Sequence, residues 1–566
     1  MDYTDGETIT IPGGLNVVGR LHFPSSTNVV VRTTAVFVQG SWSMDIPGEG
    51  NRVTVSLFGS EEQTLYPHNS CCENIDDAYG YDCSCSMAEG IGKKPFVVAG
   101  GQLDIRAIDE NCASWTKLKN INVDTMQSFT VDTDFSNCLR PGDDLVVTSD
   151  TWSFGGHTTF TVDSVDKATG NVVLQETMPR VFPSEAGPGE PWLAVEVAVL
   201  RRDVLFTAET DPEEDWIGGH SIVYHTPNVV QTIQGVMFDN FGQEGVLGRY
   251  PIHFHMSGAT SSLVSKNVIV NSNQRCVFIH NTDGVTIDDN VAFDTKGHCY
   301  ATETGNERNN VFTNNLGAYT QLLTRSNGQS DSPSDTMHGK GAATFWIRNM
   351  ENTFVGNVAA GSVKEGFWLE MKDKHSNQLN AEAFKDNTAH SNFHGLLTYK
   401  RGWLPEQPAV MKNFRIYNNK EGCKFHITGN LKLTNALIAN NKHFGIRYGV
   451  WNLGVTLEDS LILGLTEDYN IRFGKTHPFP GAVGILASMN DSPSRYGQIV
   501  LKNVVFSGYT SNSRALVSYK DGRQGNDMGD PVQATNVTIV NSDENKRPRL
   551  DSCDSFYNNW FMEDFD

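Results

Sequence analysis

Histidines, arginines and carboxylates gather in one short part of the chain, residues 247–309. The histidines are His253, His255, His280 and His298, and the other candidates are Arg249, Arg275, Asp283, Asp294, Tyr300 and Glu303. Imidazole, phenol and carboxyl groups can transfer protons, and a guanidinium group can bind a carboxylate through two parallel hydrogen bonds. These residue types favour acid–base chemistry on a substrate that carries negative charge.

A repeat indicates how these side chains are positioned. The segment Asn267–Asn271 (NVIVN) is followed 23 positions later by Asn290–Asp294 (NVAFD). The same offset relates Arg275 to His298, Cys276 to Cys299, His280 to Glu303 and, one step earlier, His253 to Cys276. A fixed period in the twenties is typical of a solenoid, and it suits one coil of a parallel β-helix. Equivalent residues of successive coils then lie about 4.8 Å apart.

Alternation along the strands predicts which side chains share a face. We expect one outer wall to carry His253, His255, Cys276, Phe278, His280, Cys299, Ala301 and Glu303. The opposite set is more apolar and should point inward; it contains Ile252, Phe254, Met256, Arg275, Val277, Ile279, His298, Tyr300 and Thr302. Arg275 and His298 fit this inner set only if they lie at strand starts, where the chain turns. Cys276 and Cys299 should be neighbours, either disulfide-bonded or stacked.

Composition limits the fold class and the partners. The 566 residues include 52 glycines, 21 prolines and 19% charged residues, in short runs rich in Val, Ile, Phe and Thr, which is typical of an all-β protein. The net charge of −22 argues against nucleic-acid binding. No run of 18 apolar residues occurs, so we expect no membrane insertion by this chain. Its opening, MDYTDGETITIP, lacks a signal peptide, and we expect a leader to have been removed or missed.

Three regions follow from the pattern of turns and strands. Residues 1–190 read as a glycine-punctuated β domain with a cysteine-rich insert at 61–92, residues 191–542 as the parallel β-helix, and residues 543–566 as an acidic-aromatic tail. Asparagines recur at the turns of the solenoid, where their amides can bond from coil to coil. The insert carries Cys71, Cys72, Cys83 and Cys85, for which we expect local disulfides, with a metal knot as the alternative. Asn490 and Asn536 begin N-glycosylation sequons.

Three long motifs carry a family resemblance. They are GQEGVLGRYPIHFHMSG (242–258), NQRCVFIHNTDGVTIDDNVAFDTKGHCYATETG (273–305) and ATFWIRNMENTFVGNVAAGSVKEGFWLE (343–370). They resemble the family of the cell-surface hyaluronidase and the cell-migration-inducing hyaluronan-binding protein, with fibrocystin-like proteins as more distant members. The N-terminal segments KPFVVAGGQLDI and SWTKL resemble the eight-glycine domain of that family.

The resemblance implies a right-handed parallel β-helix, an extracellular or cell-surface location, and binding or depolymerisation of hyaluronan. It also implies calcium dependence, so calcium is the cofactor we expect. The chain shows no anchor and no clear match to the extra lectin-like modules of larger members. Because the family includes members without established catalysis, membership alone does not make the chain an enzyme.

Cleavage of a hexosamine–uronate chain can follow two routes. Hydrolysis needs a general acid and a second carboxylate, for which Glu303, Asp294 and Asp283 are candidates. Elimination needs a base at uronate C5 and a cation for the carboxylate. His253, His255, His280 or Tyr300 could be the base or acid, and Arg249 and Arg275 could hold the carboxylate.

Plainer interpretations stay open for several of these residues. His253, His255, His280 and Glu303 could instead bind a transition metal. Arg275 could simply pair with Asp294 or Glu303, and Asp283 lies in an ordinary Asn-Thr-Asp-Gly turn. Trp346 and Trp368 are expected to pack in the core and not to form a surface on which sugar rings stack.

We therefore predict a glycosidase, with a polysaccharide lyase as the second reaction type, acting on hyaluronan or a related anionic glycan. His253, His255, His280, Glu303 and Asp294 are the predicted catalytic residues. The predicted substrate-binding residues are Arg249, Arg275, His298, Tyr300 and Asp283. The alternative is a non-catalytic glycan-binding or adhesion protein of the same fold.

Overall fold

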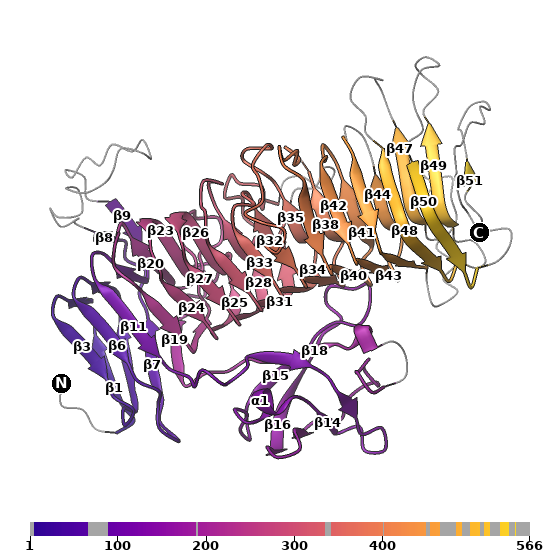
Figure 1. Ribbon diagram of the computed structural model, residues 1–566. Helices are drawn as coiled ribbons and strands as arrows, with labels where there is room; N and C mark the ends of the chain where they lie inside the picture. The colour runs from indigo at the N-terminus through magenta and orange to yellow at the C-terminus, as the bar shows by residue number, and fades with distance from the viewer. Residues whose placement is uncertain are drawn as a thin grey trace.

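The protein is a parallel β-helix with an antiparallel unit inserted near its N-terminal end, seen in a computed structural model (Figure 1). The structure describes residues 5–65, 89–187, 191–333, 341–399, 401–448, 453–464, 483–489, 498–509, 514–520, 532–542 and 549–550. The predicted all-β, parallel β-helical fold class is confirmed. The four cysteines of the predicted insert and Asn490 lie outside the described residues, and of the predicted tail only Arg549–Leu550 are described, as a short strand.

Three ladders of parallel strands run along the solenoid, and ladder C carries the candidate site. Among the described residues ladder C contains 15 strands. In spatial order they are β2 (Leu15–Val17), β5 (Val36–Val38), β10 (Pro95–Val98), β20 (His220–Tyr224), β23 (Ile252–Ala259), β26 (Val277–Asp283), β29 (Tyr300–Thr302), β32 (Ala343–Ile347), β35 (Glu365–Leu369), β38 (His394–Thr398), β41 (Glu421–Phe425), β44 (Phe444–Tyr448), β47 (Val483–Met489), β49 (Arg514–Lys520) and β51 (Arg549–Leu550).

Ladder A supplies a second wall. Its strands are β1 (Glu7–Ile11), β4 (Val29–Thr33), β7 (Val53–Leu57), β19 (Val204–Ala208), β22 (Val236–Asp239), β25 (Val268–Ser272), β28 (Val291–Lys296), β31 (Leu316–Gln321), β34 (Val358–Ser362), β37 (Thr388–His390), β40 (Arg415–Tyr417), β43 (Leu437–Ala439) and β46 (Leu461–Leu463).

Ladder B supplies the third wall. Its strands are β3 (Arg20–Phe23), β6 (Ser41–Met44), β11 (Gln102–Arg106), β21 (Thr232–Gln234), β24 (Leu263–Ser265), β27 (Thr286–Asp288), β30 (Val311–Thr313), β33 (Thr353–Val355), β36 (Phe384–Lys385), β39 (Ala409–Lys412), β42 (Leu431–Thr434) and β45 (Val455–Glu458). The long strands β48 (Ile499–Ser507) and β50 (Val532–Val540) continue both ladders A and B.

An antiparallel unit interrupts the solenoid after ladder strand β11. It contains β12 (Trp115–Lys117), β13 (Asn120–Ile121), β14 (Ser128–Thr130), helix α1 (Thr133–Ser136), β15 (Asp144–Val147), β16 (Thr158–Asp166), β17 (Asn171–Leu174), the 3-10 turn η3 (Pro191–Leu193) and β18 (Glu196–Val199). Its own core includes Phe129, Phe135 and Phe160. A separate two-stranded hairpin joins β8 (Gln63–Leu65) to β9 (Glu89–Gly92).

The solenoid begins earlier than the sequence pattern indicated. Strand β1 already pairs in parallel with β4, and β7 pairs with β19 across the inserted unit. The boundary placed near residue 191 therefore coincides with the return of the chain to the solenoid and not with its start. None of the helices among the described residues is long and apolar enough to cross a membrane.

Stacked side chains hold neighbouring coils together inside the solenoid. The rings of Phe345 and Phe367, one coil apart, have centroids 4.6 Å apart. The predicted asparagine bonding between coils is confirmed: Asn315 Nδ2 donates to Asn357 Oδ1 over 3.0 Å, and Asn357 repeats the bond to Asn387 over 3.1 Å. These bonds satisfy buried amides at each turn and fix the register of the coils.

The inserted unit covers ladder A and leaves ladder C free of it. Val146 and Ala198 of the insert pack against Val268, Val291 and Leu316 of ladder A. Figure 1 shows the insert lying along this side of the solenoid. A buried ion pair between Glu196 and His390, with 2.9 Å between Oε2 and Nε2, fastens the two parts.

Candidate active site

The candidate residues meet on the outer face of ladder C because of the pairing of three strands. His255 of β23 pairs with His280 of β26, and His253 pairs with Phe278. Ile279 pairs with Thr302 of β29, which places Glu303 beside His280. The predicted alignment of His280 with Glu303 is therefore confirmed. The predicted alignment of His253 with Cys276 is wrong, because this coil is two residues longer than the repeat.

Three imidazole rings and one carboxylate form the cluster, which we define as His253, His255, His280 and Glu303. Glu303 Oε2 lies 3.5 Å from His280 Nδ1 and 3.9 Å from His253 Nε2. The ring of His255 meets those of His253 and His280 edge-on, with centroids 5.2 and 4.7 Å apart. The His253 side chain is almost fully buried, whereas 16% of the Glu303 side chain is exposed. The carboxylate can therefore be reached from solvent.

Arg275 holds Glu303 from the other side. Its Nη1 donates to Glu303 Oε1 over 3.4 Å and to the Tyr250 hydroxyl over 2.6 Å, and its Nε donates to Asp331 over 3.1 Å. Its guanidinium also lies over the Phe278 ring, 4.0 Å from the centroid. Arg275 and Asp331 are both fully buried. Arg275 is thus a fixed positive charge behind the carboxylate, not a free group for substrate.

Burial keeps His253 and His255 of the cluster neutral. It lowers the pKa of His255 to about 2, with the neighbouring His280 adding to the effect. Burial also lowers the pKa of His253 well below its usual value, and His255 and His280 contribute. Burial opposes ionisation of Asp331, but the adjacent Arg275 charge outweighs it and lowers the pKa of that carboxyl. At neutral pH the imidazoles of His253 and His255 are therefore uncharged.

His298 and Tyr300, predicted to bind substrate, have structural positions. His298 is buried, with its ring stacked on Trp346 at 4.3 Å, and its Nδ1 accepts a hydrogen bond from the Ala343 amide. Tyr300 lies inside the solenoid, and its hydroxyl donates to the carbonyls of Asn290 and Leu316. Neither side chain is exposed to a ligand on the wall.

Asp294 and Asp283 are not brought into the cluster. Asp294 lies on β28 of ladder A, where it accepts a hydrogen bond from Gln321. Asp283 ends β26 and accepts a hydrogen bond from the Arg308 amide over 2.8 Å, in agreement with a turn role. Arg249 lies closer: its positive charge lowers the pKa of His255, after burial, His280 and His225.

The two faces of the strands differ from the predicted assignment at their first residues. Cys276 and Cys299 are buried in the solenoid core and form a disulfide, which settles the two alternatives left open for this pair. Arg275 lies over the outer side chain Phe278 instead of pointing inward. The reason is its left-handed backbone, φ 62°, which breaks the strand alternation just before β26. Trp346 and Trp368 are buried, as expected for packing residues.

Sequence reasoning missed Asp331 and Tyr250, the two partners of Arg275. Asp331 comes from the long connection between β31 and β32, outside the 23-residue period. Tyr250 stands in the RYPIHFH motif beside candidate residues, and its proximity to Arg249 and His253 was the only signal. Asp331 acts on the cluster through Arg275, and Tyr250 also contacts it directly, with its ring centroid 4.8 Å from that of His253.

A metal could be held within the cluster. One donor atom each from His253, His280 and Glu303 lies within 4.8 Å of the others. Two imidazole nitrogens and one carboxylate do not suit calcium, which takes six to eight oxygen ligands. This cluster is therefore not the site for the calcium that the family resemblance implies.

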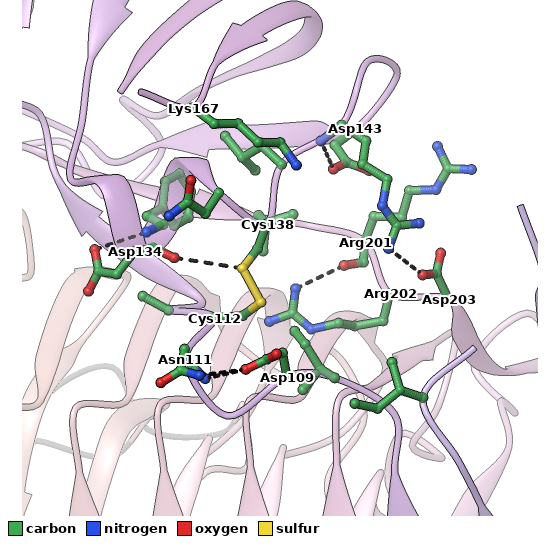
Figure 2. Close-up of a pocket in the computed structure, with 18 of the residues that line it drawn as sticks. Asp109, Asn111, Cys112, Asp134, Cys138, Asp143, Lys167, Arg201, Arg202 and Asp203 are labelled. Atoms are coloured by element: carbon green, nitrogen blue, oxygen red, sulfur yellow. Dashed lines mark hydrogen bonds and ion pairs between the residues drawn. A yellow bond between two sulfur atoms is a disulfide. The ribbon is translucent and has the colours of Figure 1, made fainter. Parts of the chain in front are cut away.

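A separate pocket of about 560 Å³ lies between the insert and the solenoid (Figure 2). The Cys112–Cys138 disulfide and the charged side chains Arg201, Arg202 and Asp203 line it. Several of the charged side chains that line the pocket have partners within the protein: Arg140 pairs with Asp203 over 2.8 Å, and Arg202 donates a hydrogen bond to Ser114 Oγ. The pocket shares no residue with the cluster and is best explained as a seam between the two parts.

Comparison with known proteins supports the family resemblance for the part of the chain that holds the cluster. Residues 216–396 match the family model described as CEMIP beta-helix. The cell surface hyaluronidase CEMIP2 of Homo sapiens is 26% identical over 382 residues, which cover 59% of this chain and 27% of that protein. Fibrocystin-L of Mus musculus is 30% identical over 260 residues, covering 41% of this chain and 6% of that protein.

A G8 domain-containing protein of Dictyostelium discoideum is 33% identical over 215 residues, covering 35% of this chain and 19% of that protein. The chain thus spans less than a third of the length of each of these relatives. Among solved structures, a periplasmic alginate epimerase is 10% identical with a TM-score of 0.31, covering 94% of this chain and 79% of that one. The catalytic unit of a GH87 alpha-1,3-glucanase from Streptomyces thermodiastaticus is 13% identical with a TM-score of 0.34, covering 71% and 96%.

Proposed function

We propose that this chain, whose residues 216–396 match the CEMIP beta-helix family, binds a uronate-containing glycan of the hyaluronan class along ladder C and cleaves it at the His253–His255–His280–Glu303 cluster. The observation that carries the proposal is the convergence of two imidazoles, His253 and His280, on one partly exposed carboxylate, with the His255 ring beside both. Packing of the solenoid does not require this group of histidines and a carboxylate, because apolar stacking inside the solenoid already holds the coils together. The name of the human relative, a cell surface hyaluronidase, supports the substrate class.

Cationic side chains farther along ladder C suit an anionic polymer. Lys364 and Lys420 lie over the Phe393 ring, and Lys424 lies over Tyr399. The pKa of Lys424 is lowered chiefly by burial, and both carboxylates, Glu421 and Glu365, and cations, Arg447 and Lys364, lie near it. The four cations of this stretch outnumber these two carboxylates, and on a protein of net charge −22 this local excess favours one binding track for a polyanion.

Hydrolysis is the first reaction we propose, with Glu303 as the carboxylate and a cluster histidine as proton carrier. Elimination is the second candidate, and one observation favours it. Within the described residues, Asp331 is engaged by Arg275 and Asp294 lies on ladder A, so Glu303 is the one carboxylate of the cluster. Two-carboxylate hydrolysis needs a pair of these groups about 5–9.5 Å apart, whereas elimination needs a base such as neutral His255.

We also propose that the protein works outside the cell, as a secreted or surface-bound molecule. Two disulfides, Cys112–Cys138 and Cys276–Cys299, support this location because such bonds persist in oxidising compartments. Calcium dependence remains part of the proposal, with an ion held elsewhere than in the cluster.

The test uses the purified chain with high-molecular-weight hyaluronan at neutral and mildly acidic pH, with and without calcium. Chain length is read on a gel while absorbance follows the unsaturated uronate that elimination leaves. Shortening without absorbance supports hydrolysis, and shortening with absorbance supports elimination. Retention on immobilised hyaluronan with unchanged chain length would replace the proposal with the binding-protein alternative. If the chain neither binds nor shortens any of a panel of uronate polymers, the cluster has a structural role and not a catalytic one.

A further inference from the structure

The cluster contains three buried imidazole nitrogens that no hydrogen bond satisfies. Within the described part of the chain, His253 Nε2, His255 Nδ1 and His280 Nδ1 lack a hydrogen-bond partner. Buried polar atoms are almost always paired, so each exception needs an explanation such as an absent ion. Single histidines elsewhere, His157, His220, His394 and His426, also have an unsatisfied ring nitrogen among the described residues. The cluster differs from them in that two such nitrogens, His253 Nε2 and His280 Nδ1, approach the same carboxylate oxygen of Glu303.

The tautomer of His253 can be assigned from its surroundings. Its Nδ1 lies 3.1 Å from the Gly248 carbonyl oxygen, which can only accept a hydrogen bond. The proton of the neutral ring must therefore be on Nδ1, and Nε2 directs a lone pair toward Glu303 at 3.9 Å. A ring nitrogen fixed in this way by a backbone carbonyl is the usual arrangement for a metal-binding histidine.

The same arrangement orients the other two donors. Arg275 binds Glu303 through Oε1 and leaves Oε2 directed at the two histidines. His280 Nδ1 lies 3.5 Å from Oε2 and has no hydrogen-bond partner among the described residues. All three donor atoms fall within 4.8 Å of one another, a separation that one small cation can bridge after minor side-chain movement.

We propose that His253 Nε2, His280 Nδ1 and the Glu303 carboxylate bind a divalent transition-metal ion such as Zn²⁺. A set of two imidazoles and one carboxylate leaves a position open for water or a substrate oxygen, which is typical of catalytic zinc sites.

His255 is then the neighbour of the ion and not its ligand. It lies beside both metal-binding histidines, with its ring stacked on Tyr224 at 5.3 Å. Only the chemical role of the ion rests on the proposed function: a bound cation would neutralise a uronate carboxylate while His255 carries a proton. Metal binding itself does not depend on the identity of the glycan.

The test compares the whole chain with four variants after removal of metals by a chelator. Zn²⁺ and Co²⁺ binding are measured by equilibrium dialysis and calorimetry, and visible absorption reports the coordination of Co²⁺. The wild-type chain should bind a single ion, with a rise in melting temperature. His280→Gln and Glu303→Gln should weaken binding at least about tenfold, the loss seen even when only an outer partner of a ligand is removed. His375→Gln, an exposed histidine of the same region, should bind like wild type.

His255→Gln separates the ligands from their neighbour, because it should keep the Co²⁺ spectrum. Circular dichroism checks that each variant folds. Unchanged binding in both His280→Gln and Glu303→Gln, or no binding by the wild type, overturns the inference. Metal binding without glycan cleavage would refute the proposed function but would support the metal site. Full cleavage by the metal-free protein would refute a catalytic role of the ion but would support the proposed function.

Discussion

The carboxylate of Glu303 lies 3.4 Å from the guanidinium of Arg275, one coil away on the wall of the solenoid. Arginine keeps its proton under all ordinary conditions, so this positive charge is permanent. Arg275 in turn is fixed by Asp331 and Tyr250. The position of the carboxylate therefore depends on a buried group of side chains that no substrate needs to touch.

Glu303→Gln should abolish glycan cleavage while the fold persists. The amide keeps the size of the side chain but removes its negative charge and its basicity. We expect a loss of about 10²- to 10⁴-fold in turnover, measured as the rate of hyaluronan shortening. Glu351→Gln is the matched control, since Glu351 forms an ion pair with the largely exposed Arg308. Wild-type turnover in Glu303→Gln would remove this residue from the mechanism.

Asp331→Ala should destabilise the protein strongly. It leaves the fully buried Arg275 with one carboxylate fewer, and an uncompensated buried charge costs about 3–5 kcal/mol. Removing the partly exposed Glu351 carboxylate, which pairs with the largely exposed Arg308, should cost about 1 kcal/mol or less. Urea denaturation followed by circular dichroism compares the two variants. Similar midpoints for both would mean that Glu303 and Tyr250 suffice to hold Arg275.

Replacing Cys276 and Cys299 together with alanine should lower the free energy of unfolding by about 3 kcal/mol, as expected for a closed loop of this length. The disulfide joins adjacent coils 23 residues apart directly behind the cluster. The measurement is thermal unfolding of both proteins without reductant. If the double variant melts with the wild type, stacking alone holds these coils.

The buried histidines should make the protein sensitive to acid. Burial and the neighbouring His280 lower the pKa of His255 to about 2, far below its value of about 6.5 in the unfolded chain. Below pH 6.5 the unfolded chain binds a proton that the folded protein refuses, so stability falls as pH falls. Each such histidine contributes a slope of about 1.4 kcal/mol per pH unit between these pKa values.

His255→Gln should remove one such contribution. We expect a shallower decline of the unfolding free energy between pH 6 and 4, measured by urea denaturation at each pH. An identical decline in the variant would show that His255 becomes protonated in the folded protein.

The sequence allowed the outer wall of ladder C and part of the cluster to be predicted. The predicted positions that were wrong have local structural reasons. His280 meets Glu303 because the coil between them keeps the 23-residue period in its turns. His253 meets Phe278 and not Cys276, because the preceding coil is two residues longer. The outward position of Arg275 depends on a left-handed backbone that alternation cannot represent.

Two other features had no periodic signal. Asp331 reaches Arg275 from a long connection whose path is set by tertiary packing. The first coils do repeat, since Glu7 pairs with Val29 and Val29 with Val53. The next partner of Val53 is Val204, so the inserted unit hides the continuity of the solenoid.

The long separation in sequence between β7 and its partner β19 affects the order in which the chain can fold during synthesis. The open edge of β7 pairs with a strand that begins 151 positions later, after the whole inserted unit. At about 5–20 residues per second, the ribosome leaves this edge uncovered for on the order of 10–30 s. The insert has its own core and can fold during that interval, which shortens the distance the chain must span. The N-terminal coils of the nascent chain therefore keep an unpaired strand edge, open to pairing with another chain, until β19 binds to β7, and a folded insert brings β19 closer to that edge.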